Sequence, residues 1–456
     1  MKDKAFYKKF LALSVPIALQ QLLKALMYFI DNIMIGSLGE NAIVGVGNAN
    51  QIAFFIFVAM FGVCSAGWVF AARFHGEGDA GGIKSTLGLC LIGTFIIGFV
   101  FFVLALVTPK GLISIFNQTP GVVESGSEYI RIVGISYIFS GISQSYANVL
   151  KGCQRTRIPV VTGFISVGVN ACINYALIGG NWGFPALGVQ GAAIGTVVGS
   201  LLDAALIVII SYSRGNEARA KLSELFPGLA RMKKLVGEFL KVGVPIIINE
   251  TMWALYSVVL VMLYNRMGVG VAAAMSIAGA LDRLAYVVYM GIANTSGVMI
   301  GNRLGEGDRE KAYIYARRFL RMAPLSTVAV GALVLLALPL FLAQYDVAAA
   351  TSELVRRVVY INTAVAWIIM INNTNIIGVL RGGGDTRFAA TIDLTGCWAL
   401  TLPVAYITAL ALGLPIYIVY PCAIIAGESF KLIFGLRRFR SGKWMHDITS
   451  AIRAAD

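Results

Sequence analysis

Charged side chains are scarce in this chain of 456 residues: Asp, Glu, Lys and Arg together make up 13% of it. Soluble domains contain about 25% charged and about 45–50% apolar residues, whereas 58% of this chain is hydrophobic. The shortage of charge excludes a soluble enzyme with a small anchor, a pair of soluble domains and a disordered protein. A membrane-spanning helix needs about 20 apolar residues, so the hydrophobic content is enough for about twelve spans.

Cysteine and histidine are also few, with six and two residues. The cysteines form no CxxC pair, which excludes a disulfide-stapled secreted module and gives no metal-ligand pattern. The histidines, His75 and His446, fall in predicted loops, so a membrane metalloprotease or a histidine-dependent transferase is not expected. Neither GxxxxGKS nor GxxxxGKT occurs, which argues against ATP as the energy source. We therefore expect no cofactor and no resident metal.

Long apolar runs alternate with short segments that contain Gly, Pro or charged residues. Lipid cannot satisfy an open sheet edge, and a membrane β-barrel would show short alternating segments, so each run predicts a helix. The expected fold class is an all-α polytopic membrane protein with about twelve transmembrane helices. The predicted spans are 11–36, 43–72, 86–108, 129–150, 158–178, 188–212, 242–265, 271–300, 318–343, 354–380, 388–411 and 415–436.

Lys and Arg gather on one side of these spans. With the N-terminus placed inside, 29 of the 37 basic residues lie in inner segments and 5 in outer segments. Because cytoplasmic loops collect Lys and Arg, this bias predicts a multi-pass protein of the cell membrane with both termini in the cytoplasm. The bias also accounts for the net charge of +14 without nucleic acid as a partner.

The second half of the chain repeats the first half at an offset of 229 or 230 residues. Six spans in each copy give both copies the same orientation, and such parallel repeats are typical of transporters with a site near the midplane at the repeat interface. We expect an N-lobe at 1–212, a cytoplasmic linker at 213–241, a C-lobe at 242–436 and a cytoplasmic tail at 437–456. The matching segments are VPI from residues 15 and 244, GEGD from 76 and 305, and VLKG from 149 with VLRG from 379.

The duplicated chain resembles the multidrug and toxic compound extrusion (MATE) family. The resemblance rests on twelve spans in two copies, an Asp near the outer end of the first span, and the VL(K/R)G…TR signature after the fourth and tenth spans. The segments VLRGGGDTR and NYALIGGNWGFPALGVQGAAIG carry it most specifically. The resemblance implies two V-shaped lobes of six helices around a central cavity. It also implies efflux of organic, often cationic compounds, driven by the entry of Na⁺ or H⁺.

Three polar residues of the first copy align with apolar residues of the second, so the shared fold does not need them. Asp31 aligns with Leu260, and Asn170 and Asn174 align with Leu400 and Val404. The two asparagines are four residues apart on one helical face, where amide and carboxylate oxygens suit Na⁺ or hold a protonated carboxyl group. We predict a cation-coupling site for H⁺ or Na⁺ at Asp31, Asn170 and Asn174; packing between helices is the alternative.

The family's branches imply different partners for the Asp of the first span. In the DinF-like branch it works with an Asn and, one turn further on, an acid, but this chain has Asn174 at that position. The Asn-x-x-x-Asn pattern is closer to the NorM-like branch, which has an acid in the seventh span, matched here by Glu250. NorM-like members also have an Asp in the tenth span, where this chain has none. We therefore expect mixed features of the two branches.

Further polar and aromatic residues are predicted to surround the substrate. An ionisable group inside a span usually faces a cavity or a partner, and aromatic rings accept flat cations. Acid–base neighbours at Asp282–Arg283 and Glu428–Lys431 are predicted to form internal ion pairs. The predicted substrate-cavity residues are Gln21, Lys24, Tyr28, Glu250, Trp253 and Asp282, with Phe54, Phe57 and Met290 as further packing surfaces.

The leading hypothesis is a secondary active antiporter, not an enzyme, that works by alternating access. Its predicted partners are small organic substrates, the coupling cation and membrane lipid, and we expect a monomer. Two alternatives stay open. A lipid-linked precursor flippase of the same superfamily would need a strongly cationic cavity, for which the spans offer only Lys24 and Arg283. A membrane-embedded enzyme would turn over its substrate in detergent, where no gradient exists.

Overall fold

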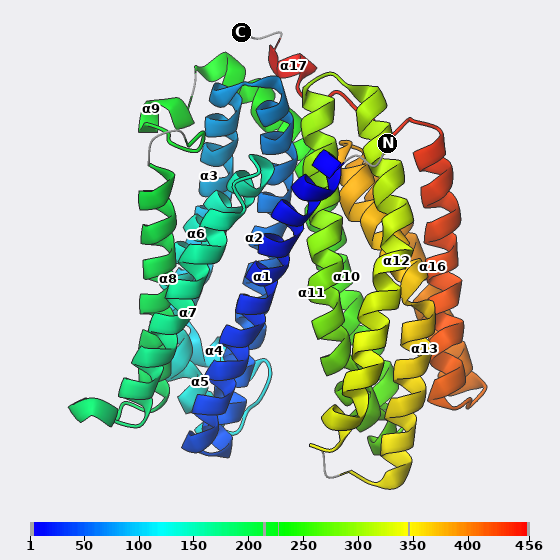
Figure 1. Cartoon of the computed structure of the whole chain (residues 1–456). Coiled ribbons are helices and arrows are strands. Elements are labelled where there is room, and N and C mark those ends of the chain that lie inside the picture. The colour runs from blue at the N-terminus through cyan, green and yellow to red at the C-terminus, as the bar shows by residue number, and fades with distance from the viewer. Residues whose placement is uncertain (1–3, 213–215, 227, 345–346, 454–456) are drawn as a thin grey trace. The chain divides into compact units, whose positions relative to one another are not determined.

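The computed structural model describes residues 4–212, 216–226, 228–344 and 347–453. Within these ranges the chain is helical, with one isolated β-bridge between Gly384 and Met445 and no β-strand. The predicted all-α fold class is therefore confirmed. The helices of the first half are α1 (Lys4–Ile35), α2 (Glu40–Glu77), α3 (Ala80–Val107), α4 (Pro109–Ser114), α5 (Pro120–Val133), α6 (Ser136–Gly152), α7 (Arg157–Ile178), α8 (Val189–Ser211) and α9 (Leu222–Leu225) (Figure 1).

The second half contains π-helical turns within its longer helices. A π-helix is rare and often occurs near functional groups. Such turns form η3 (Thr374–Leu380), η4 (Thr395–Thr401) and η5 (Ile407–Ala411). The α-helices of this half are α10 (Leu229–Asn265), α11 (Val269–Gly305), α12 (Arg309–Leu342), α13 (Ala349–Asn373), α14 (Thr386–Leu394), α15 (Leu402–Tyr406), α16 (Ile416–Arg440) and α17 (Ser450–Arg453).

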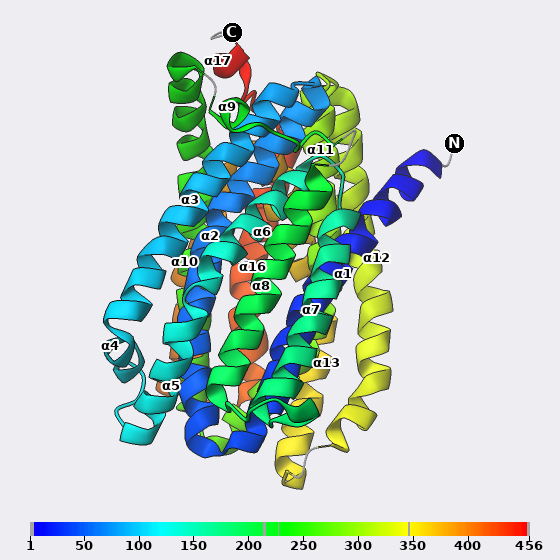
Figure 2. The ribbon, with the colours of Figure 1, turned by 90° about the vertical axis from the view of Figure 1, so that its left-hand side faces the viewer.

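Ten of the described helical segments are long and apolar enough to cross a membrane. Together with the family relationship described below, they make this a multi-pass membrane protein. One predicted span, 129–150, is divided instead between α5 and α6, which are separated by a turn at Gly134 and Ile135. Glycine weakens a helix. It also has no Cβ, and a Cβ at Gly134 would lie 3.0 Å from the Cβ of Ala105, so the glycine permits close packing against α3. Figure 2 shows α4 and α5 following the end of α3.

Helices α2 and α3 differ in how much of their apolar surface is covered by protein. The most apolar window of α2 is 67% buried, whereas that of α3 is 22% buried. Large side chains such as Phe95 and Phe99 remain exposed on α3. Helix α2 is thus an inner helix that packs against α3, α5 and α6, while α3 presents hydrocarbon-like surface that suits lipid.

The repeated GEGD motif ends one helix and begins the next. Gly78 and Gly307 have φ angles of +76° and +80°, a conformation that favours glycine. Gly78 ends α2, and Gly307 ends the turn that follows α11. The following aspartates cap the next helix, because Asp79 Oδ1 accepts from Gly82 N at 2.8 Å and Asp308 Oδ1 accepts from Lys311 N at 2.9 Å. Both copies of the motif therefore connect two helices in the same way.

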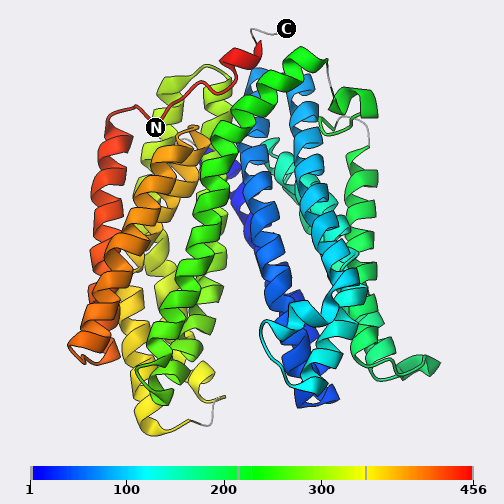
Figure 3. The same ribbon diagram turned by 180° about the vertical axis from the view of Figure 1, so that it is seen from behind.

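The chain divides into two compact units, and two of the three divisions fall inside helices, α1 and α10. Unit 1 comprises Met1–Ala18 and Val244–Ile448, and unit 2 comprises Leu19–Gly243 and Thr449–Asp456. Helix α10 is one continuous ribbon, in green in Figure 3, so the part of the predicted linker from Leu229 onward is helical. The lobe limits derived from the sequence repeat stay predictions.

Aromatic contacts explain why the start of α1 belongs to unit 1 and the start of α10 to unit 2. In unit 1, the ring of Phe6 lies 4.9 Å from that of Tyr315 and 5.2 Å from that of Phe319. In unit 2, the ring of Phe239 stacks on Phe70 at 5.7 Å. These aromatic pairs add to the burial of apolar surface in each core.

Candidate functional site

Unit 2 brings together the three residues of the predicted cation site. The side-chain amide of Asn174 donates from Nδ2 to Asp31 Oδ1 at 2.6 Å and lies 3.5 Å from Asn170 Oδ1. Both asparagines are fully buried, at 0% exposure, and Asp31 is half-buried. The end of α1 and the middle of α7 therefore form one polar cluster. Whether this cluster couples a cation stays a prediction.

Two glycines of α8 make room for this cluster. Helices α7 and α8 lie side by side (Figure 1). A Cβ at Gly195 would lie 2.0 Å from Asn174 Oδ1, and a Cβ at Gly199 would lie 3.1 Å from Asn170 Cβ. Glycines four residues apart are a known means of close helix approach in membranes. The spacing of Gly195 and Gly199 is therefore the sequence signal that could have predicted the α8 side of the site.

The cluster contains polar atoms that the protein leaves unsatisfied. Asn174 Oδ1 and Asn170 Nδ2 are buried and have no hydrogen-bond partner among the described residues. Leaving a buried polar atom unpaired costs about 1–3 kcal/mol, so such atoms in a native protein suggest a ligand, an ion or a functional role. Asn174 Oδ1 and the carboxylate of Asp31 together offer oxygen atoms of the kind that hard cations bind.

Unit 1 has an apolar cluster at the corresponding positions. Leu260 and Val404, the counterparts of Asp31 and Asn174, both pack against a core cluster that includes Leu263, Ala405 and Tyr420. The second copy thus fills this place with hydrocarbon. Asp31 and Asn174 therefore have no polar counterpart in unit 1.

The remaining predicted substrate residues are spread over both units. Gln21 is half-buried in α1, and the side chains of Lys24 and Tyr28 lie outside the described residues. Trp253 is 39% exposed in α10, and Phe54 and Phe57 are exposed in α2. Their role in a substrate cavity stays a prediction, as does that of half-buried Met290.

Glu250 forms an ion pair with Arg381, one of the 29 basic residues that the sequence assigns to inner segments between spans. Arg381 is 4% exposed and directly follows η3. Its Nη1 donates to Glu250 Oε1 at 2.6 Å. Arg381 is therefore not a loop charge: it is buried in a helix and neutralises a half-buried acid 131 positions away.

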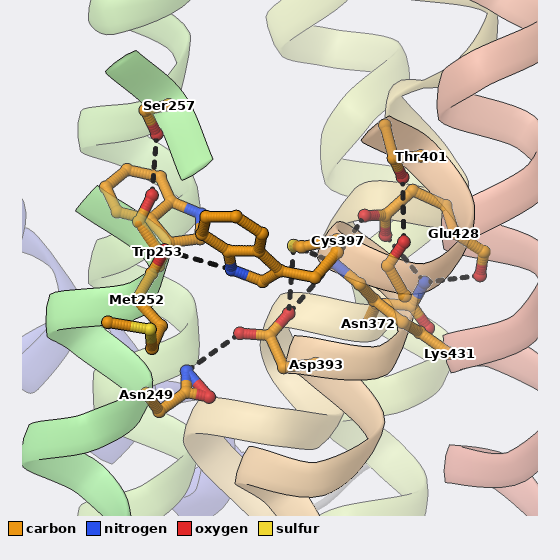
Figure 4. A network of polar contacts seen from close by, with 12 residues as sticks. Asn249, Met252, Trp253, Ser257, Asn372, Asp393, Cys397, Thr401, Glu428 and Lys431 are labelled. Carbon is orange, nitrogen blue, oxygen red and sulfur yellow. Dashed lines mark hydrogen bonds and ion pairs between the residues drawn. The ribbon is translucent and has the colours of Figure 1, made fainter. Parts of the chain in front are cut away.

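A larger network of charged and polar side chains lies in the same unit (Figure 4). Lys431 Nζ lies 2.8 Å from Asp393 Oδ1 and 2.9 Å from Glu428 Oε1. The predicted Glu428–Lys431 pair is confirmed, and Asp393 joins it. Asn249 donates to Asp393 Oδ2 at 2.8 Å, and Asn372 donates to Glu428 Oε2 at 2.8 Å. Four helical segments, α10, α13, α14 and α16, are tied together at these two carboxylates.

Asp282 does not form its predicted ion pair. It accepts a hydrogen bond from Asn362 Nδ2, and Asn362 Oδ1 in turn accepts from the Tyr420 hydroxyl at 3.2 Å. Arg283 is exposed, and adjacent residues of a helix do not face each other. The prediction of an Asp282–Arg283 pair is wrong for this geometric reason.

A duplicated, all-helical membrane protein with buried polar groups inside its spans has the organisation of a membrane transporter. The profile of the MatE family matches residues 16–176 and again residues 245–407. The two matches repeat the offset seen in the sequence and together cover more than half of the chain. The chain belongs to the MatE family, the family that its motifs resemble.

Similarity to two named proteins covers nearly the whole chain. It is 25% identical over 443 residues to "Probable multidrug resistance protein NorM" of Thermotoga maritima, covering 96% of this chain and 93% of the relative. It is 23% identical over 440 residues to "Probable multidrug resistance protein YoeA" of Bacillus subtilis, covering 93% and 92%. Both relatives are named as probable multidrug resistance proteins.

Solved structures of transporters share the fold. "Crystal structure of MATE in the bent conformation" matches with a TM-score of 0.85 and 18% identity, covering 99% of this chain and 97% of the other. "Outward-facing conformation of a multidrug resistance MATE family transporter of the MOP superfamily" matches with a TM-score of 0.82 and 19% identity, covering 96% of each chain. At these identities the likeness concerns the fold alone.

Proposed function

We propose that the protein is a secondary active antiporter that exports organic, mainly cationic compounds in exchange for H⁺ or Na⁺. The observation that carries the proposal is the contact of Asn174 with Asp31, inside a cluster whose counterpart in unit 1 is apolar. The names of its relatives as multidrug resistance proteins support the substrate class. The basic residues support an orientation with both termini in the cytoplasm.

The half-buried carboxylate of Asp31 is the group that changes state. When ionised, it accepts the hydrogen bond of Asn174 and contributes the negative charge that favours a cationic substrate. A proton on Asp31 neutralises that charge directly. A Na⁺ ion would be held by Asp31 together with Asn174 Oδ1, which has no partner among the described residues. Either cation weakens substrate binding, and the coupling is reciprocal.

Alternating access completes the proposed cycle. The coupling cation binds Asp31 from outside, the substrate leaves, and release of the cation inside restores the ionised carboxylate. Because the energy comes from the ion gradient, transport stops when the gradient is removed. The protein does this as a monomer, with small organic molecules, the cation and lipid as its partners.

Efflux of a fluorescent organic cation from proteoliposomes tests this function, with Na⁺ and pH gradients imposed separately. The wild-type protein is expected to respond to one of the gradients. Asp31→Asn is expected to lose that response, because the amide neither ionises nor binds a proton. Glu353→Gln serves as the control, since Glu353 is an exposed acid paired with Arg357 within α13.

The outcome that contradicts the proposal is normal, gradient-dependent efflux by Asp31→Asn. A second pair of variants uses the residues of the other copy, Asn170→Leu and Asn174→Val. Loss of coupling in these variants with a retained folded state supports the assignment of the amides. Flipping of a lipid headgroup without efflux of the cation would instead favour a flippase.

A further inference from the structure

His75, Cys153 and Glu217 form a cluster in unit 2 that the proposed transport cycle does not use. One nitrogen, sulfur or carboxylate oxygen from each residue lies within 4.8 Å of the corresponding atoms of the other two. His75 lies in the last turn of α2, Cys153 directly follows α6, and Glu217 lies in the segment between α8 and α9. The histidine is helical, so the prediction of a loop position for it is wrong.

The three side chains already interact with one another. His75 Nδ1 lies 2.6 Å from Glu217 Oε2. Burial would raise the pKa of Glu217, but the hydrogen bond and charge of His75 hold that pKa below its usual range. Burial raises the pKa of the Cys153 thiol, and the hydrogen bond to the Glu217 carboxylate raises it further. The cluster therefore contains a thiol, an imidazole and a carboxylate that face a common point.

We propose that His75, Cys153 and Glu217 bind a divalent transition-metal ion of the Zn²⁺ class. Imidazole nitrogen, thiolate sulfur and carboxylate oxygen are the three protein ligands that Zn²⁺ uses. Zn–N and Zn–O distances of about 2.0–2.2 Å and a Zn–S distance of about 2.3 Å place tetrahedral ligand atoms about 3.3–3.8 Å apart. To reach that spacing the His75–Glu217 contact would open by about 1 Å, and the Cys153 sulfur, which lies within 4.8 Å of both other ligand atoms, would settle at the Zn–S distance; a water would fill the fourth position.

Burial and exposure in the cluster are compatible with an ion that enters from solvent. The side chains of His75 and Glu217 are 24% and 33% exposed, whereas Cys153 is 3% exposed. The thiol is therefore buried more deeply than the two other ligands. Arg155 is the nearby opposing charge, since it acts electrostatically on both Cys153 and Glu217.

The second copy of the fold provides an internal comparison. At the repeat offsets of 229 for the first residue and 230 for the other two, His75, Cys153 and Glu217 correspond to Leu304, Gly383 and Asp447. Only the acid has a counterpart that can bind a metal. The shared fold therefore requires neither the histidine nor the cysteine, and the meeting of all three ligands is specific to unit 2. Among the described residues, this is the one group of three such ligands.

A bound ion would connect three segments that are distant in the sequence. Glu217 precedes α10 in the chain, whereas His75 and Cys153 belong to the helical body of unit 2. The ion would fix the segment after α8 against the ends of α2 and α6. This inference does not rest on the proposed transport function, because it concerns binding alone.

Metal titration of the full-length protein in detergent, with any affinity tag removed and after treatment with a chelator, tests the site. The probe is ZnCl₂ in isothermal titration calorimetry, and one equivalent is expected to bind. Cys153→Ser, His75→Ala and Glu217→Gln are each expected to weaken binding by at least about tenfold. Cys172→Ser and His446→Ala are matched controls that remove a cysteine and a histidine elsewhere, and they are expected to bind normally.

Co²⁺ provides a second measurement that does not depend on any variant. A thiolate–Co²⁺ charge-transfer absorption in the near ultraviolet is expected with the wild-type protein and not with Cys153→Ser. Zn²⁺ is also expected to raise the melting temperature of the wild-type protein, because it binds the folded state. Absence of the thiolate band, or one equivalent of Zn²⁺ retained by all three variants, would overturn the proposal.

Discussion

The buried charges of unit 1 are held by side chains from other helices or from the next turn of the same helix. Glu250 is paired with Arg381, and Lys431 lies between Asp393 and Glu428. Removing charges from water costs several kcal/mol per ion. The energetic importance of each residue therefore depends on whether its partner remains.

Arg381→Met is expected to lower stability, because it leaves the carboxylate of Glu250, which is only 18% exposed, without its cation. Breaking a buried pair costs about 3–5 kcal/mol, whereas replacing both partners by apolar residues is often neutral. The double variant Glu250→Met/Arg381→Met is therefore expected to recover much of the lost stability. Melting temperatures in detergent measure this, and a double variant that melts below both single variants contradicts it. The exposed pair gives the control: Arg357→Met is expected to change little.

The comparison between the two copies singled out residues that lie close together in the fold, whereas their role as a cation site stays a prediction. Asp31, Asn170 and Asn174 stand out because their counterparts are apolar, and the structure brings these three together. The same reasoning offered nothing for Arg381, since both copies carry a basic residue there and the motif looks like a loop. Its partner lies in another helix, and only the folded chain shows such long-range pairing.

Small residues determine how closely α7 and α8 approach, and they do so next to the candidate cation site. Gly195→Ala is expected to displace the Asn174 side chain from Asp31, because the new Cβ would lie 2.0 Å from Asn174 Oδ1. Gradient-coupled efflux in proteoliposomes should fall as it does for Asp31→Asn. Gly47→Ala in α2 is the matched control, since a Cβ there meets nothing within 4 Å. That variant is expected to stabilise its helix by up to about 1 kcal/mol. Equal transport by both variants would contradict the role given to Gly195.

The two GEGD caps are expected to differ in importance although their geometry is alike. Asp79 also receives Arg231 Nη2 at 2.6 Å, which fastens the start of α10 to the start of α3. The salt-bridge partner of Asp308 is Lys311 of its own helix. Asp79→Ala therefore removes a cap, at a cost of about 0.5–2 kcal/mol, and an additional tie between helices. Its melting temperature should fall further than that of Asp308→Ala, and the reverse order would refute this account.

At the scale of elements, composition predicted where helices lie better than where they are interrupted. The segment 129–150 was predicted as one span, but it is divided between α5 and α6 at Gly134 and Ile135, where α3 packs closely. Conversely, the charged stretch RMKKLVGEFLK continues as helix α10 because Leu235 and Phe239 are buried in unit 2. Tertiary packing determines both outcomes, and the local sequence does not reveal that packing.

The whole molecule is organised by duplication, and the distribution of Lys and Arg predicts its direction in the membrane. Gln118→Cys, in the exposed segment between α4 and α5, is expected to react with a membrane-impermeant maleimide in intact cells. Arg219→Cys, in the segment after α8, should react only after the membrane is permeabilised. The exposed native thiols, Cys172 and Cys422, are first replaced by Ser. Labelling with the opposite pattern would reverse the orientation.

The duplication was the most informative feature of the sequence, and the family match follows it. It could not show that each compact unit includes a segment from the other half of the chain. That exchange depends on where aromatic residues such as Phe6 and Phe239 find complementary surfaces. Because the two copies have similar apolar stripes, the sequence does not predict which unit each segment joins.

The division of the chain inside α1 and α10 has a consequence for expressing the protein as two separate fragments. A polypeptide ending within the segment between α8 and α9 would retain Met1–Ala18, which belongs to unit 1. The complementary polypeptide would carry the opening turns of α10, which belong to unit 2. Neither fragment then contains all of the unit that it mostly encodes. Expressed singly, each is expected to be degraded, whereas co-expression should allow the two to complement one another and be purified as a stoichiometric pair.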